Sequence, residues 1–217
     1  MAIHDADDIR AWIRAHGYFI KIDRNEFVFH EGQPDDRLFL ISSGRVVVQR
    51  RTQMGDIATV TLLGRDDLFG ELAILGDSRR TATVRSLEKC SFHILNRDKF
   101  ADLRAAHPEA GAAIEQMLAD MVRRLTDQLV EALYEDARVR LARRLVSLAD
   151  MYEACDGAIP IPLTQEMIGS MAGVKLRQTA KRLQEFADVD LIRLERSRVF
   201  VTDYERLRAK GRLPKVA

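Results

Sequence analysis

Residues 70–84 of this 217-residue chain read GELAILGDSRRTATV, and they contain the pattern that decides the fold. A glycine that opens a short helical turn offers free backbone N–H groups and the positive end of a helix dipole, which suits a phosphate. Arg80 follows Glu71 closely enough to fold back over the same point and supply a bidentate pair of N–H donors. Glu71 would then need a hydrogen-bond donor, such as a sugar hydroxyl. The alternative is an ordinary salt bridge between Glu71 and Arg80, and the residues alone do not decide.

Short apolar runs flank this stretch from Glu26 to about Leu95. Segments rich in Gly, Pro, Asp and Ser separate these runs, so each run predicts a β-strand. Many short strands at this spacing are typical of a sandwich, a barrel or a jelly roll. A short amphipathic helix, Asp5 to His16, precedes them. The expected strands are 27–29, 38–41, 46–48, 58–61 and 91–95.

A long amphipathic helix is predicted from about Glu109 onward. Its apolar residues recur in steps of three or four and form one stripe. A stripe of this length needs something to pack against, and two partners fit: the chain's own β-domain, or a second copy of the helix across a two-fold axis. Periodicity favours neither. The stripe consists of Ile114, Leu118, Met121, Leu125, Leu129 and Leu133.

The C-terminal part is predicted to hold two helices joined by a sharp turn. A helix over 137–153 and a turn-rich segment over 155–162 come first. Helices 164–171 and 175–186 follow; Thr164 suits an N-cap and Gly173 permits the turn between them. The second helix presents basic and amide side chains, and an alternating hairpin with three arginines follows, so this part could bind DNA or could be a solvated basic surface. The expected DNA contacts are Thr164, Gln165, Lys175, Arg177, Gln178, Lys181, Arg182, Arg196 and Arg198.

The charge distribution agrees with a DNA-binding C-terminal half. Residues 138–217 carry 16 Lys and Arg against 10 Asp and Glu, whereas the preceding residues carry 18 against 23. The half with excess positive charge is the one that could approach a phosphate backbone.

Several classes of protein are disfavoured by composition. No apolar run is long enough to span a membrane, and the acidic N-terminus does not resemble a signal peptide. Two distant cysteines and five scattered histidines predict neither disulfides nor a metal site, so we expect a cytoplasmic protein without bound metal. No nucleophile–base motif or Walker loop is found, and we expect no enzymatic activity.

A family resemblance sharpens the first site. The sequence FGELA followed by RTATV resembles the phosphate-binding cassette of cyclic-nucleotide-binding domains. The resemblance implies that Glu71 bonds the ribose 2′-hydroxyl and that Arg80 bonds the cyclic phosphate. A hydroxyl residue directly after the arginine is compatible with either cGMP or cAMP, and a hydroxyl on the long helix would contact the base. The implied ligand-binding residues are Gly70, Glu71, Leu72, Ala73, Arg80, Thr81 and Thr126.

The order of segments from about residue 20 to 205 resembles the CRP/FNR (catabolite activator protein) family. One departure is the start of the second helix of the pair, Lys175 to Lys181. The Glu and Arg that read bases in well-known members correspond to Arg177 and Lys181 here. The DNA site is therefore expected to differ from the family's commonest one.

These observations predict an α+β fold in three parts. They are an N-terminal β jelly-roll cyclic-nucleotide-binding domain over 1–108, a long dimerisation helix over 109–136 and a C-terminal winged helix-turn-helix over 137–217. The expected function is transcription regulation by a homodimer that binds palindromic double-stranded DNA under control of cAMP or cGMP, with RNA polymerase as a further partner. The alternatives are another effector, such as cyclic di-GMP, or constitutive DNA binding with a vestigial pocket.

Overall fold

The computed structural model describes residues 5–76 and 78–213, and the chain divides into two compact units. The first unit holds residues up to 125 except 58–60, and the second holds those three residues and residues from 126 onward. Among the helices of these described residues, none is both long and apolar enough to cross a membrane.

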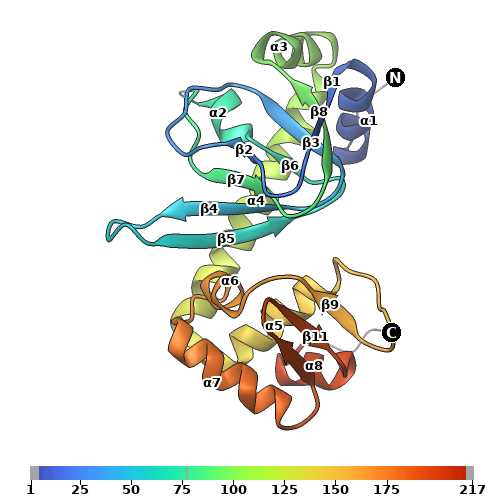
Figure 1. Cartoon of the computed structure of the whole chain (residues 1–217). Helices are drawn as coiled ribbons and strands as arrows, with labels where there is room; N and C mark the ends of the chain where they lie inside the picture. Colours follow the sequence, from blue (N-terminus) through green and yellow to red (C-terminus); the bar gives the residue numbers. More distant parts are fainter. Residues whose placement is uncertain (1–4, 77, 214–217) are drawn as a thin grey trace. The chain divides into compact units, whose positions relative to one another are not determined.

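The first unit contains two antiparallel four-stranded sheets, with strand orders β1-β8-β3-β6 and β2-β7-β4-β5 (Figure 1). A cluster of apolar side chains fills the sandwich, including Phe39, Phe69 and Phe92. The expected strands are confirmed, and the structure adds β1, β6 and β7. The bounds are β1 Tyr18–Ile22, β2 Phe27–Phe29, β3 Leu38–Ser43, β4 Val46–Arg51, β5 Ile57–Leu63, β6 Leu68–Phe69, β7 Thr83–Ser86 and β8 Cys90–Leu95.

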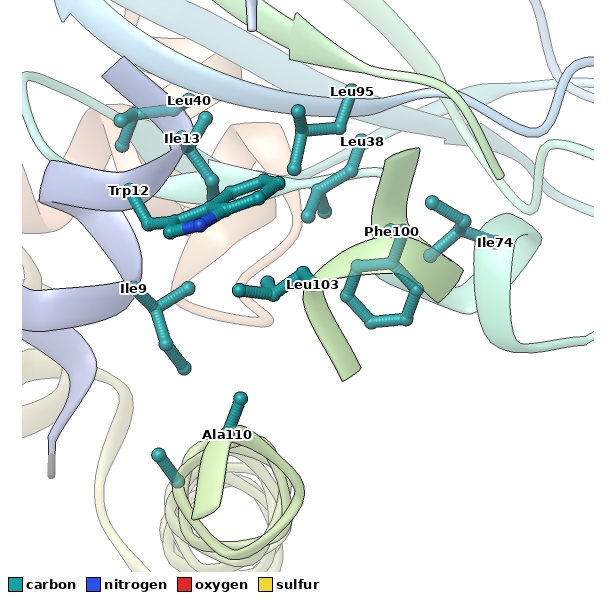
Figure 2. Close-up of a cluster of buried hydrophobic side chains, with 11 residues drawn as sticks. Ile9, Trp12, Ile13, Leu38, Leu40, Ile74, Leu95, Phe100, Leu103 and Ala110 are labelled. Carbon is teal, nitrogen blue, oxygen red and sulfur yellow. The ribbon is translucent and has the colours of Figure 1, made fainter. Parts of the chain in front are cut away.

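Three short helices join a second apolar cluster in this unit, which Figure 2 shows. Trp12 comes from α1, Ile74 from α2 and Phe100 from α3, and all three are buried beside strand residues such as Leu38. The helices are α1 Ala6–His16, α2 Glu71–Leu75 and α3 Arg97–Ala106. Helix α1 confirms the predicted amphipathic helix, and its Asp5 N-cap accepts hydrogen bonds from two backbone N–H groups of the first turn.

Helix α4, Glu109–Tyr134, begins in the first unit and ends in the second. Its first turns pack against the cluster of Figure 2 through Ala110 and Ala113, and Ile114 is partly buried there. Farther along, the stripe is exposed: Leu125 is 48% and Leu129 58% accessible. The predicted stripe therefore has two parts, one covered by the chain's own β-domain and one open.

The second unit holds a helical core with a three-stranded sheet of order β10-β11-β9. Strand β9 lies in the segment that the sequence predicted to be turn-rich, and α5 ends earlier than predicted. Helix α8 was not predicted. The bounds are α5 Ala137–Ala149, β9 Ile159–Ile161, α6 Gln165–Met171, α7 Leu176–Ala187, β10 Ile192–Glu195, β11 Arg198–Val201 and α8 Tyr204–Lys210.

Helices α6 and α7 pack closely, as a helix-turn-helix requires. Thr164 caps α6 as predicted, since its side chain accepts a hydrogen bond from the Met167 N–H. A β-carbon built on Gly169 would lie 2.2 Å from Oγ1 of the fully buried Thr179, so only glycine fits at this contact. The α6–α7 angle thus depends on a residue without a side chain.

Arginines of α5 tie the end of α4 to the helix-turn-helix within this unit. Arg143 pairs with Glu131 of α4 at 2.7 Å. Arg140 donates to the carbonyl of Ala132 in α4 and to that of Gly173 in the turn before α7. A displacement of the end of α4 would therefore also displace the turn before α7.

Candidate functional site

Arg80 is a buried arginine at the end of the cassette, with 3% of its surface accessible. Its Nη2 lies 3.0 Å from Asp35 Oδ2 and donates to the Arg37 carbonyl at 2.7 Å. The guanidinium carbon stands 4.0 Å from the centre of the Phe29 ring, a cation–π contact. Arg80 is therefore fixed by its own domain before any ligand is considered.

Asp35 is the partner of Arg80 that the sequence did not identify. The loop that carries Asp35 runs beside the cassette, because the Asp35 N–H donates to the Ser78 carbonyl and the Arg80 N–H donates to the Gln33 carbonyl. The salt bridge considered between Glu71 and Arg80 is not formed: within the described chain, the carboxylate paired with Arg80 is that of Asp35.

The charges in this cluster are strongly coupled. Burial raises the pKa of Asp35, but hydrogen bonds from Arg37 and Arg80 outweigh it, so its pKa lies below the usual value. Burial lowers the pKa of Arg80, and Asp35 partly offsets that effect. Arg37 donates one hydrogen bond to each carboxylate oxygen of Asp35, both at 2.8 Å, and these bonds raise the pKa of Arg37. Two arginines thus share one carboxylate, which leaves a net positive charge in the cluster.

One donor of Arg80 has no partner within the described residues. Its Nε is buried and makes no hydrogen bond, and its Nη1 makes only a long bond of 3.3 Å to the Gly70 carbonyl. A buried donor without a partner is costly, and an anionic oxygen would satisfy it. The donor set therefore fits a phosphate.

Glu71 is a carboxylate held in a largely desolvated position. Burial raises the pKa of Glu71 above its usual value, while backbone N–H groups and the charge of Arg80 lower it by less. A carboxylate in this condition gains from any additional donor. A hydroxyl of a bound ligand is such a donor.

Gly70 allows the backbone to approach Arg80. Its φ of +90° lies in the left-handed region, where glycine is favoured. An added β-carbon would also meet Arg80 Nη1 at 2.5 Å and the Arg37 carbonyl at 2.8 Å. A larger residue here would displace the guanidinium.

Arg97, which the sequence did not single out, holds the middle of the cassette in place. Its Nη2 donates to the Ala73 carbonyl at 3.0 Å and to Ser78 Oγ at 2.8 Å. Its Nε lies 3.4 Å from Asp36 Oδ2. The adjacent residues Asp35 and Asp36 therefore each pair with an arginine of this site: Asp35 pairs with Arg80, and Asp36 pairs with Arg97.

The structure brings Gly70, Glu71 and Arg80 together. The other four expected ligand-binding residues differ in how accessible they are. Ala73 is buried, whereas Leu72 and Thr81 are exposed. Thr126 is exposed on α4, in the part that belongs to the second unit. Its role toward a base therefore stays a prediction.

The first turns of α7 form the candidate nucleic-acid interface. Lys175, Arg177, Gln178 and Lys181 are exposed. Their side chains make no hydrogen bond or ion pair with other described residues, so the side-chain donors are available to phosphates and base edges. Figure 1 shows α7 (orange) on the outside of the second unit.

The remaining expected DNA contacts are more constrained. Arg182 pairs with Glu185 at 2.9 Å, and Arg198 with Glu195 at 3.5 Å. Arg196 is exposed at the hairpin tip between β10 and β11. Thr164 is engaged as the cap of α6, and Gln165 is partly buried.

Across residues 5–76 and 78–213, no group of three His, Cys, Asp or Glu side chains is arranged to hold a metal ion.

Both halves match known domain families. Residues 19–107 match the cyclic nucleotide-binding domain, and residues 139–210 match the Crp-like helix-turn-helix domain. The chain is therefore a transcription regulator that joins a cyclic-nucleotide-binding domain to a helix-turn-helix DNA-binding domain.

The chain belongs to the CRP/FNR family of transcription regulators. It is 32% identical over 196 residues to the CRP-like cAMP-activated global transcriptional regulator of Mycobacterium tuberculosis, which covers 89% of this chain and 88% of that protein. FixK2 from Bradyrhizobium japonicum shares the fold, with a TM-score of 0.75, 15% identity and coverage of 93% of this chain and 99% of that chain. The c-di-GMP responsive regulator CLP of Xanthomonas campestris has a TM-score of 0.72 at 17% identity, with coverage of 91% and 99%. The predicted family and fold are confirmed.

Proposed function

We propose that this protein is a homodimer that binds palindromic DNA in response to a cyclic nucleotide, with cAMP as the effector. The observation that carries the proposal is the buried Arg80, whose Nε has no partner within the described residues and which lies in the cassette that also carries Glu71. A cyclic phosphate would accept from Arg80, and the ribose 2′-hydroxyl would donate to Glu71. The Mycobacterium tuberculosis relative, named as cAMP-activated, supports cAMP.

A second effector, cGMP, is favoured by Thr81. Its hydroxyl follows Arg80 directly, is exposed and makes no hydrogen bond within the described chain. A hydroxyl there can accept from the guanine amino group, which adenine lacks at that position. Substitution of Thr81 by Ala separates the two: it would weaken cGMP and leave cAMP binding nearly unchanged.

The dimer is proposed from the open part of the stripe on α4. Leu125, Leu129 and Leu133 are exposed at successive turns, an arrangement that a second α4 would cover. A two-fold dimer would place two α7 helices in successive major grooves, about 34 Å apart, and would favour a palindromic site.

Gating of DNA binding is proposed to pass through α4. Arg140 links the end of α4 to the turn before α7, and Arg143 of the same helix pairs with Glu131 of α4. A nucleotide raises DNA affinity only if it binds the DNA-competent arrangement more tightly than the other one. By linkage, DNA must then raise nucleotide affinity by the same factor. Contact with RNA polymerase is a further part of the proposal.

Calorimetry of the full chain with cAMP, cGMP and cyclic di-GMP tests the effector. We expect saturable binding of cAMP, and a DNA affinity that rises with it at constant salt. Tighter binding of cyclic di-GMP than of cAMP would identify cyclic di-GMP as the effector instead. Equal DNA affinity with and without every nucleotide would indicate a constitutive regulator with a vestigial pocket.

A further inference from the structure

Leu176 is a large apolar side chain that α7 leaves in solvent. It is 53% accessible, and it is the first residue of the helix, directly after the Lys175 N-cap. The helix buries its apolar face elsewhere, through Thr179, Leu183 and Phe186. Leu176 therefore contributes little to the core of its own unit.

The surroundings of Leu176 are those of a DNA-reading surface. Arg177 and Lys181 are exposed beside it and make no ion pair with described residues. Ala180, one turn later, is also exposed, and residues four apart are neighbours on a helix surface. Leu176 and Ala180 thus form a small apolar patch at the N-terminal end of α7. In a helix-turn-helix, this end of the second helix enters the major groove.

We infer that Leu176, with Ala180 beside it, is a specificity determinant that reads the 5-methyl group of a thymine. The thymine methyl is the apolar group that the major groove presents, and apolar side chains recognise it by contact. The leucine side chain has no hydrogen-bonding group, so it donates no hydrogen bond to a phosphate. This inference rests on the proposed binding of DNA by α7.

Thymine-to-uracil replacement isolates the contact, because deoxyuridine lacks the methyl group but keeps every hydrogen-bonding group. A site is first selected from randomised duplexes with the full chain and cAMP, and each thymine is then replaced in turn. We expect the wild type to lose about fourfold in affinity at one thymine of each half-site, the effect of removing one buried methyl group, and about 15-fold when both are replaced.

Leu176→Ala should bind the thymine site about as weakly as the wild type binds the uracil site, and should lose nothing further on replacement. The matched control is Val189→Ala, because Val189 is the other exposed large apolar side chain among the described residues after α4, at 45% accessibility beyond the end of α7. Val189→Ala should keep the full thymine preference. Both variants should retain the wild-type Tm, since both side chains are exposed.

The outcomes separate the inference from the proposed function. A wild type that binds its selected site and tolerates uracil at every thymine overturns the role of Leu176 alone. A Leu176→Ala variant that still prefers thymine does the same. A wild type that enriches no sequence, with or without nucleotide, overturns DNA binding by α7 and the inference with it.

Discussion

The carboxylate of Asp35 and the guanidinium of Arg80 form an ion pair inside the β-domain, with Oδ2 and Nη2 3.0 Å apart and both side chains at most 5% accessible. The arginine that would hold a phosphate is therefore neutralised in part by its own domain. An anionic ligand meets an oriented guanidinium instead of a mobile one. The pair gives Arg80 a structural role in addition to the ligand-binding role that we propose for it.

Asp35→Asn should destabilise the ligand-free protein by about 3 kcal/mol, because it leaves buried arginine charge without its counter-charge. Asp36→Asn is the matched control: Asp36 pairs with Arg97 at 3.4 Å, both side chains are about two-fifths accessible, and the cost should stay below about 1 kcal/mol. Urea unfolding measures both. Equal costs would contradict a special role for the buried pair.

The stability gained from Asp35 should depend on pH. Its folded pKa is lowered by Arg37 and Arg80 against the effect of burial. The contribution is therefore complete above the ordinary carboxyl pKa of about 4 and is lost as the pH falls through the lowered value. Unfolding free energies of the wild type and Asp35→Asn should converge in acid, and a constant difference would argue against ionisation as the cause.

Glu71→Gln should have opposite effects on stability and on binding. The pKa of Glu71 is raised by burial, so its ionised form weakens the folded state at neutral pH. The variant should melt higher than the wild type at pH 7, and the gain should vanish as the pH falls below about 4, where the carboxyl is protonated in both states. Nucleotide affinity should fall, and it should fall much less for a 2′-deoxy analogue, which lacks the hydroxyl that Glu71 would bind.

Replacement of two helical glycines by alanine should change the free energy of unfolding in opposite directions. Gly169→Ala would press a β-carbon against Thr179 and should cost about 1–3 kcal/mol in the second unit. Gly111→Ala in α4 meets no atom within 4 Å and should stabilise by about 0.5–1 kcal/mol, because alanine favours helix. Thermal melts of both variants report the difference. A neutral Gly169→Ala would mean that α6 and α7 can separate without cost.

Leu125→Asp with Leu129→Asp should produce folded monomers, because a two-fold seam would bury the introduced carboxylates in each subunit. Both positions are exposed in the single chain, so the monomer itself should remain stable. Gln116→Asp, also exposed but on the opposite side of α4 from the stripe, is the control and should stay dimeric. Sedimentation measures the state, and a monomeric wild type at micromolar concentration would refute the dimer.

Arginine and lysine on α7 should differ in what they contribute to DNA binding. Lys181→Ala should lower the salt slope of binding by about one unit at every sequence, and Arg177→Ala should in addition relax the preference for one base. Arg182→Ala is the control, because Glu185 already pairs with Arg182. Nucleotide affinity without DNA should be unchanged in all three variants.

The sequence predicted those features that depend on local pattern. The amphipathic helices α1 and α4 follow from periodicity, and the cap at Thr164 follows from residue type. Strand β9 was missed because Pro160 lies within its three residues, and proline normally marks a break.

The contacts around Arg80 were harder to predict. Asp35 and Arg97 reach the cassette only through the tertiary approach of distant segments, which leaves no local pattern. The Arg182–Glu185 pair was within reach of sequence reasoning, since residues three apart on a helix are neighbours.

The hold of Arg97 on the cassette has a kinetic consequence. Its bonds to the Ala73 carbonyl and Ser78 fix the end of α2 through a side chain from α3. The conformational entropy of that segment is then lost during folding and not during association, so less binding free energy is spent on ordering. Association should therefore be close to a simple collision-limited process. A variant in which Arg97 no longer makes these bonds should have a lower association rate constant for nucleotide, and its dissociation rate constant should change less.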